Sequence, residues 1–202
     1  MTATTADRRR ALGAKGNRTR QRILDAAETV FVELGYHDAS IVRITETAGV
    51  AQGTFYIYFA GKRQLFEELV DDLNRRVRHA MTEASGRGSS RMDAERLGFA
   101  AYFAFVAEHP GLYRIMRQAE FVAPHQLRAH YDRIVSGYTE RLRSAMDAGE
   151  IPDGQPELMA WALMGLGEMV GMRWVLWQDG APVPNDVLDS TASVVARILG
   201  VS

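Results

Sequence analysis

The sequence predicts an all-helical protein, and three observations support this fold class. Apolar residues recur at three- and four-residue spacing along most of the 202 residues, whereas the alternation typical of half-buried strands is scarce. Glycines and prolines stand between the periodic segments, where helices begin or end. With 47% hydrophobic and 24% charged residues, the chain is long and apolar enough to bury a core. Disordered and collagen-like classes are excluded.

The first two helices are bounded by recognisable caps. The first is expected from about Arg18 to Leu34, closed by Gly35, because glycine readily adopts a left-handed cap. Ser40 is a suitable N-cap for a second helix, which Gly49 stops. The apolar face expected for the first helix consists of Ile23, Leu24, Ala27, Phe31 and Leu34.

Two more helices and a linker follow. A short helix is expected over about 52–58, and Gly61 separates it from a long helix over 62–83. The segment 85–91 has no apolar residue and two glycines, which predicts a linker with a domain boundary near it. Beyond it, the periodicity predicts helices at about 93–108, 111–121, 124–148, 156–178 and 185–199.

Charge is unevenly distributed. The net charge is −1, but residues 1–22 hold seven Lys or Arg and one Asp, a local net charge of +6. A basic chain end of this kind is typical of an arm that contacts a polyanion, or of a merely solubilising segment. We expect residues 1–17 to form a flexible basic arm.

Several classes of site are excluded or disfavoured by composition. The chain has no cysteine, which removes disulfides, thiolate metal sites and cysteine nucleophiles, and favours the cytoplasm. The apolar stretch 158–177 contains Glu168 and Arg173, each of which costs about 2.5–3.5 kcal/mol at a membrane centre. We interpret it as a buried helix, and we expect no membrane contact, no metal and no cofactor.

The segment 40–62 has the organisation of a helix-turn-helix. Two short helices are joined at 48–51, where Gly49 permits the sharp turn. The residues at 51–54 are small or polar and can approach base edges in a major groove. Phe55 and Phe59 are expected to face inward, leaving Tyr56 and Tyr58 outside to donate hydrogen bonds to phosphate oxygens.

These residues carry a resemblance to a known family. The segment resembles the DNA-binding domain of the TetR/AcrR family of transcriptional regulators over about residues 18–70. The residues that match are Ala48-Gly49-Val50, Gly53-Thr54-Phe55-Tyr56, Tyr58-Phe59, Lys62 and Leu65, preceded by Ile23-Leu24-Asp25-Ala26-Ala27 and by Phe31 to Gly35. Thr45 stands where the family usually has alanine, and Val42 where a polar residue is common.

The resemblance implies an N-terminal helix-turn-helix domain over 18–62, and a C-terminal ligand-binding and dimerisation domain over 63–202, connected by the helix 62–83. It also implies that Gln52 reads bases and that Thr54, Tyr56, Tyr58 and Lys62 contact phosphates. The full set of residues expected to face DNA is Ser40, Arg43, Gln52, Gly53, Thr54, Tyr56, Tyr58 and Lys62.

The second half predicts a dimer face and a cavity. The helix at 158–177 is apolar all round and must be covered on every side, so one face is expected to meet a second copy of the chain. The residues expected at this interface are Gly171, Arg173, Trp174, Val194 and Ile198. Aromatic and methionine side chains are expected to line a cavity for an acyl chain or a flat hydrophobic compound. The residues expected there are Phe99, Tyr102, Phe103, Tyr113, Met116, Glu120, Trp161, Met164, Glu168 and Met172.

These features together predict a ligand-responsive regulator. We expect a homodimeric repressor that a small hydrophobic effector releases from a near-palindromic operator on double-stranded DNA. The alternative is a helical small-molecule carrier that does not bind DNA, for which duplex binding with its steep salt dependence would be absent. An enzyme is disfavoured, because the segment 165–171 nearly matches a dinucleotide fingerprint but follows no strand.

Overall fold

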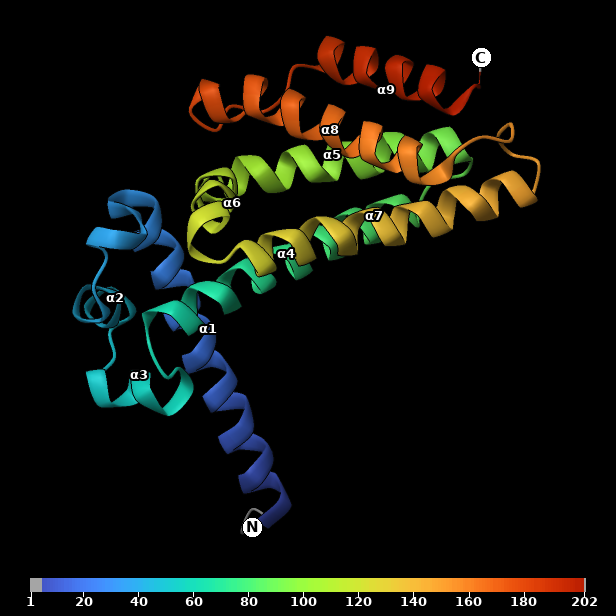
Figure 1. Cartoon of the computed structure of the whole chain (residues 1–202). Helices are drawn as coiled ribbons and strands as arrows, with labels where there is room; N and C mark the ends of the chain where they lie inside the picture. Colours follow the sequence, from blue (N-terminus) through green and yellow to red (C-terminus); the bar gives the residue numbers. More distant parts are fainter. Residues whose placement is uncertain (1–4, 202) are drawn as a thin grey trace.

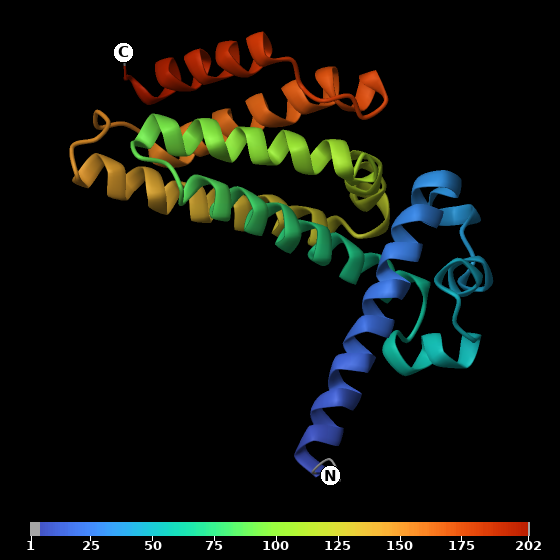
Figure 2. The ribbon, with the colours of Figure 1, turned by 180° about the vertical axis from the view of Figure 1, so that it is seen from behind.

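The computed structural model describes residues 5–201, with side chains from residue 16 onward, and all regular elements in this range are helical. The helices are α1 (Thr5–Asp38), α2 (Ile41–Ala48), α3 (Gln52–Tyr58), α4 (Lys62–Ser85), α5 (Arg91–Glu108), α6 (Gly111–Val122), α7 (Pro124–Asp147), α8 (Pro156–Trp174), the 3-10 turn η1 (Leu176–Gln178) and α9 (Asn185–Leu199). The predicted all-α fold class is confirmed. Helices α1–α3 gather at one end, α5–α9 form a bundle at the other, and α4 joins the two (Figures 1 and 2).

Helix α1 begins earlier than the sequence pattern predicts. The pattern gives a start near Arg18, whereas the helix reaches back to Thr5 and projects away from the bundle (Figure 1). Residues 5–17 are therefore helical here rather than a flexible arm, in keeping with the high helix propensity of their alanines and arginines. The side chains of Arg8, Arg9, Arg10 and Lys15 lie outside the described set, so their contact with a polyanion stays a prediction.

Helix α1 is broken at Gly35, where the sequence predicts its end. Gly35 has φ 77° and ψ 164°, values outside the helical region, and a further turn continues to Asp38. Most of the predicted apolar face is buried, and Phe31 packs edge-to-face on Phe66 of α4, with ring centroids 5.2 Å apart. Leu34 is the exception: it is 43% exposed, because it lies beside the break and not over the core.

The helix-turn-helix forms as its caps predict. The Ser40 hydroxyl oxygen accepts a hydrogen bond from the backbone N–H of Arg43 at 3.1 Å, which caps α2. Gly49 closes α2 in the left-handed region, with φ 63° and ψ 42°. Helix α3 then spans Gln52–Tyr58, and Phe55 and Phe59 are fully buried beneath it.

The segment at 85–91 is a tight connection and does not divide the chain. It joins α4 to α5, which pack along each other within the bundle. A side chain at Gly88 would collide with the backbone of Ala94, so the turn needs glycine for close approach. The predicted linker and the boundary near it are therefore wrong, since a composition rich in glycine and serine serves a short turn equally well.

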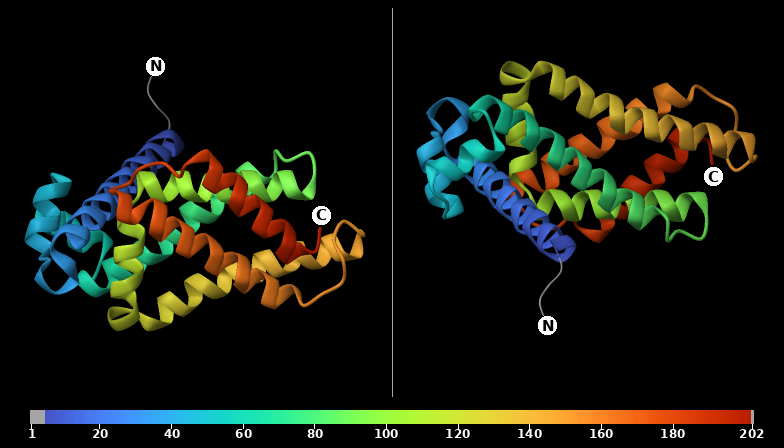
Figure 3. Two further views of the ribbon diagram at one scale, coloured as in Figure 1. Left: turned by 90° about the horizontal axis from the view of Figure 1, so that it is seen from above. Right: turned by 90° about the horizontal axis from the view of Figure 1, so that it is seen from below.

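Helices α8 and α9 form the outer layer of the bundle (Figure 3). The predicted helix at 156–178 is divided into α8 and η1, and the remaining helices of the bundle start and end within two residues of their expected limits. Within residues 5–201, no helix has the length and apolar character needed to cross a bilayer.

Candidate nucleic-acid interface and ligand cavity

Helix α3 presents a solvent-facing surface above a buried aromatic base. Gln52, Gly53 and Tyr56 are exposed on it, and Tyr56 retains 59% of its accessible surface. Ile57, which sequence analysis does not single out, is 76% exposed on the same helix. Because Phe55 and Phe59 are buried, the rotation of α3 about its axis is determined, and its amide and phenol groups point to solvent. This surface can approach a groove of a duplex.

Helix α2 adds a small polar flank. Arg43 is exposed, and its backbone carbonyl accepts a hydrogen bond from the Thr47 hydroxyl at 2.9 Å. Ser40 is also exposed, but its hydroxyl is already used as the N-cap. Arg43 is therefore the residue of α2 that offers a positive charge to a partner.

Thr54 and Tyr58 are half-buried, in contrast with the exposed part of α3. A side-chain Cβ at Gly16 would lie 3.6 Å from the Tyr58 hydroxyl oxygen, so the early turns of α1 run beside the end of α3. The Tyr58 hydroxyl therefore lies at the edge of α3 that adjoins α1.

Lys62 does not face outward as predicted. Its ammonium donates to the backbone carbonyls of Tyr36 (2.7 Å), Ala39 (2.8 Å) and His37 (3.1 Å) and lies 4.6 Å from the centre of the Tyr36 ring. The three donors of the ammonium are thus used at the end of α1. Lys62 ties α4 to the segment before α2, and its assignment as a phosphate contact is corrected.

Two arginines of α1 also stabilise this end of the molecule. Arg22 donates to the backbone oxygens of Ala48 (2.5 Å) and Gly49 (3.2 Å), at the turn between α2 and α3. Arg20 pairs with Glu68 of α4 and lies over the Phe59 ring, 5.3 Å from its centre. In the sequence both residues count only toward the basic charge of residues 1–22, because charge alone does not distinguish an arginine that binds its own fold.

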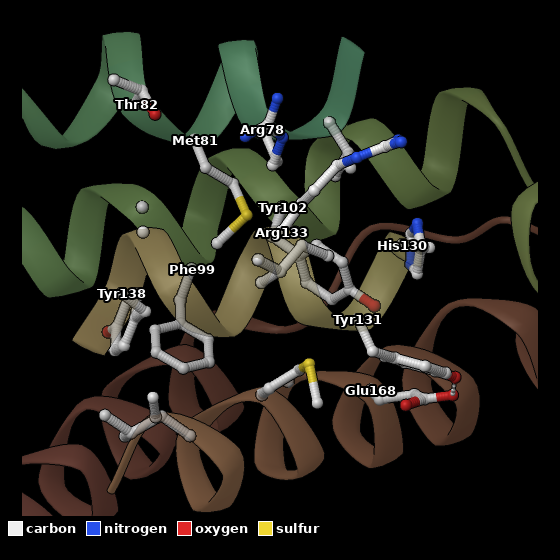
Figure 4. A pocket seen from close by; sticks show the side chains of 18 of the residues that line it. Arg78, Met81, Thr82, Phe99, Tyr102, His130, Tyr131, Arg133, Tyr138 and Glu168 are labelled. Atoms are coloured by element: carbon white, nitrogen blue, oxygen red, sulfur yellow. Dashed lines mark hydrogen bonds between the residues drawn. The ribbon is translucent and has the colours of Figure 1, made fainter. Parts of the chain in front are cut away.

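A cavity of about 130 Å³ lies in the bundle, between α4, α5, α6, α7 and α8 (Figure 4). Six predicted ligand residues line it: Phe99, Tyr102, Tyr113, Met116, Met164 and Glu168. The other four lie elsewhere. Phe103 is buried in the core, Glu120 is exposed, Trp161 is 42% exposed, and the Met172 sulfur accepts a hydrogen bond from Arg117.

One end of the cavity holds a chain of hydroxyl groups. The Tyr113 hydroxyl donates to the backbone oxygen of Glu168 at 2.9 Å, and the Tyr102 hydroxyl lies 2.9 Å from that of Tyr113. Tyr131 donates to Glu168 Oε1 at 3.3 Å (Figure 4). Burial raises the pKa of Tyr102 and Tyr113 and raises that of Tyr131 to about 12, so these phenols stay protonated and act as neutral hydrogen-bond donors.

Several polar cavity residues lie on α4 and α7 and escape sequence analysis. His130 Nδ1 lies 2.8 Å from the Asn74 amide nitrogen, so it acts as the acceptor. Burial lowers the pKa of His130 to about 4, with a smaller effect in the same direction from Arg133 and Arg78. In the sequence, polar residues of this kind resemble the solvent-exposed face of a helix. They face the cavity only because α4 and α7 pack beside each other.

Glu95 is buried at the far part of the cavity. It forms an ion pair with Arg91 and accepts a hydrogen bond from the Tyr138 hydroxyl. Burial raises the pKa of Glu95, although the neighbouring Arg91 opposes this effect. Figure 4 shows Tyr138 toward one side of the cavity and Tyr131 toward the other.

The predicted dimer residues are divided between surface and interior. Gly171 lies against Tyr113 and Tyr102 of its own chain, where an added Cβ would collide with the Tyr113 hydroxyl, so it is not at an outer face. Arg173 is exposed and lies over Trp174, while Trp174 and Ile198 are half-buried and Val194 is 37% exposed. Exposed apolar side chains of α8 that sequence analysis missed are Leu158 and Met169.

Comparison with known proteins matches residues 23–69 to the bacterial regulatory proteins of the tetR family. The uncharacterized HTH-type transcriptional regulator YdgC of Bacillus subtilis (strain 168) is 43% identical over 65 residues, 32% of this chain and 33% of that protein. The fatty acid metabolism regulator protein of the same strain is 29% identical over 161 residues, 77% of this chain and 82% of that protein.

A crystal structure gives the same result for the fold. The transcriptional regulator FadR from Bacillus subtilis, in complex with stearoyl-CoA, superposes with a TM-score of 0.73 at 22% identity, over 89% of this chain and 97% of that one. The matched segment 23–69 contains the turn, the exposed α3 and the start of α4 described above. Residues 23–69 thus match the tetR family of bacterial regulatory proteins, and the chain as a whole shares the fold of solved TetR-family transcriptional regulators.

Proposed function

We propose that the chain is a homodimeric repressor in the cytoplasm, which binds a near-palindromic operator through α3 of each protomer. An effector with an apolar chain enters the cavity and weakens that binding. Residues 18–62 serve as the DNA-binding unit, and residues 63–202 serve in ligand binding and dimerisation. The observation that carries the proposal is the connection of an exposed α3 to a cavity by one continuous helix, α4.

Gln52 is the proposed base reader, with Thr54, Tyr56 and Tyr58 at phosphates. The glutamine amide can form two hydrogen bonds with adenine, whereas a phenol hydroxyl suits a phosphate oxygen. On duplexes selected from random sequence, Gln52→Ala should change the base preference. Tyr56→Phe should weaken all duplexes alike. Equal preferences for Gln52→Ala and the unaltered protein would contradict the role of Gln52.

The proposed dimer face is the exposed apolar side of α8, flanked by α9. Leu158, Trp161 and Met169 recur at helical spacing and expose 64%, 42% and 52% of their surface. Exposed apolar patches of this kind mark protein interfaces. Met169→Asp should give a monomer in sedimentation and weaken operator binding, whereas Phe121→Asp, at an 82% exposed site on α6, should leave the dimer intact.

The proposed effector is an acyl chain with an anionic head. The cavity walls contain Met81, Phe99 and Met164, while Arg78 and Arg133 lie together on its α4–α7 side (Figure 4). The complex of the structurally similar FadR with stearoyl-CoA supports this class of ligand. Stearoyl-CoA should lower duplex affinity about 5- to 150-fold, the usual range of allosteric coupling, and free CoA should not. No effect of stearoyl-CoA would reject this ligand class.

A further inference from the structure

Helix α6 contacts the cavity with one face and α1 with the other. Leu112, Tyr113 and Met116 line the cavity. Gln118 and Arg114, one turn apart on the opposite side of α6, form hydrogen bonds with the backbone of α1. A ligand that displaces the first face therefore also displaces the second, because a short helix moves as one body.

The contact with α1 falls on the break at Gly35. In a continuous helix the Tyr36 N–H would bond to the Val32 carbonyl. Here the Tyr36 N–H donates to Gln118 Oε1 at 2.6 Å, and Arg114 donates to the Val32 oxygen at 3.4 Å. Gln118 Nε2 also donates to the Phe31 oxygen at 3.2 Å. The amide of Gln118 thus bonds to the chain on both sides of the break.

A third hydrogen bond, within α6 itself, fixes the orientation of the Gln118 side chain. Its second N–H donates to the Arg114 carbonyl in its own helix, at 3.1 Å. Both amide hydrogens and the amide oxygen are therefore occupied, a pattern that needs a donor and an acceptor on one side chain. A carboxylate of the same shape could keep the bond from Tyr36 but would lose both donated bonds.

The segment after the break leads directly into the DNA-reading helices. Lys62 holds the carbonyls of Tyr36, His37 and Ala39 from the other side, and Ser40 caps α2 immediately afterwards. The packing of α6 on α1 is close, since a side chain at Gly111 would collide with Val32. A shift of α6 is therefore passed to residues 36–39 and then to α2.

We propose that Gln118 is the positioning residue that connects the state of the cavity to the orientation of α2 and α3, through its amide bonds to Phe31 and Tyr36. This inference rests on the proposed function, in which a ligand in the cavity changes operator binding. Gln118 thereby links the cavity to α2 and α3 in addition to the link that α4 provides. Its side chain contacts neither ligand nor DNA.

The first test measures the ratio of duplex affinities without and with saturating stearoyl-CoA. Gln118→Ala should reduce this ratio about 2- to 30-fold, the range for residues that carry coupling, while the affinity for stearoyl-CoA stays the same. Gln118→Glu, which keeps the acceptor, should retain part of the ratio. Gln155→Ala, which removes an exposed glutamine with no capping bond, should not change it. An unchanged ratio in Gln118→Ala overturns the proposal, and so does a parallel loss of ligand affinity.

The second test needs no ligand and separates this inference from the proposed effector. Because coupling is reciprocal, a duplex selected from random sequence should alter hydrogen exchange of the 111–118 amides in the unaltered protein and in Gln155→Ala, but not in Gln118→Ala. Exchange of the Tyr36 amide should be faster in Gln118→Ala even without DNA. Equal exchange in all three proteins overturns the role of Gln118, whereas failure of stearoyl-CoA to bind rejects only the ligand class.

Discussion

The surface of α3 and the cavity of the bundle hold their polar groups in opposite ways. On α3, Gln52 and Tyr56 are exposed, and the residues beneath them are purely apolar. In the cavity, polar side chains are paired within the protein, as in Asn74 with His130 and Glu95 with Arg91. Substitution of an exposed residue of α3 should thus change duplex affinity with little loss of stability. Substitution of a polar cavity residue leaves its buried partner without a hydrogen bond and should also lower stability.

The largest expected effect tests the apolar base of α3. Phe55 is fully buried, so Phe55→Ala should lower the free energy of unfolding by about 3–5 kcal/mol, through lost burial and a new void. Ile57→Ala, at a 76% exposed position two residues away, should stay within about 0.5 kcal/mol. Denaturant unfolding of both variants measures the difference, and similar values would contradict the orientation of α3.

The second prediction concerns pH and His130. Its pKa is lowered to about 4 in the folded chain, against 6.5 for the ordinary group, so the unfolded chain binds more protons between these values. Stability from the neutral imidazole is therefore present above pH 6.5 and is lost as pH falls toward 4, by up to about 3 kcal/mol. His130→Gln should flatten this part of the pH profile in thermal unfolding. An equally steep profile would argue against His130 as its cause.

Lys62 lies between α3 and the bundle that holds the cavity, and its substitution should have an intermediate effect on stability. Lys62→Met keeps the apolar stem but removes the bonds to three carbonyls, which should destabilise the chain by about 1.5–3 kcal/mol. The salt dependence of duplex binding should not change, because the ammonium points into the protein. Arg63→Met, the next residue and an exposed cation, is the matched control and should leave stability nearly unchanged.

The smallest effect is expected on α2, at the edge of the exposed face of α3. Arg43→Gln removes an exposed charge on α2, and the slope of log affinity against log salt concentration should fall by about 0.9 if Arg43 neutralises one phosphate. Unfolding should be unaffected. A slope equal to that of the unaltered protein would remove Arg43 from the interface and leave the neutral groups of α3 as the contacts.

The limits of α2 and the exposed face of α3 could be predicted because their causes are local. Ser40 and Gly49 determine the ends of α2 through contacts a few residues away, and Phe55 and Phe59 are one helical turn apart. The cavity depends on distant partners: Asn74 and His130 are 56 residues apart, and Tyr113 and Glu168 are 55 residues apart. A single sequence does not reveal which side chains meet over such separations.

Lys62 and the turn at 85–91 illustrate two other reasons for error. A lysine at the start of a helix points outward on most surfaces, and nothing in its neighbours signals that the carbonyl end of α1 lies within reach. The glycines of the turn match the composition of a flexible linker, although Gly88 is there because Ala94 packs against it. In both cases the deciding contact comes from tertiary packing rather than from local pattern.

The narrowness of the cavity has a consequence for what the regulator can detect. At about 130 Å³ it is smaller than the roughly 300–1,000 Å³ of most ligand pockets. A larger ligand would need the cavity to widen, and Met81 and Met164 in its wall have unbranched side chains that can change rotamer. In the proposed function, ligand affinity would then depend on the free energy of widening the cavity as well as on the contacts made. Replacing these methionines with stiffer or smaller residues should change the response to ligand without changing the preferred duplex.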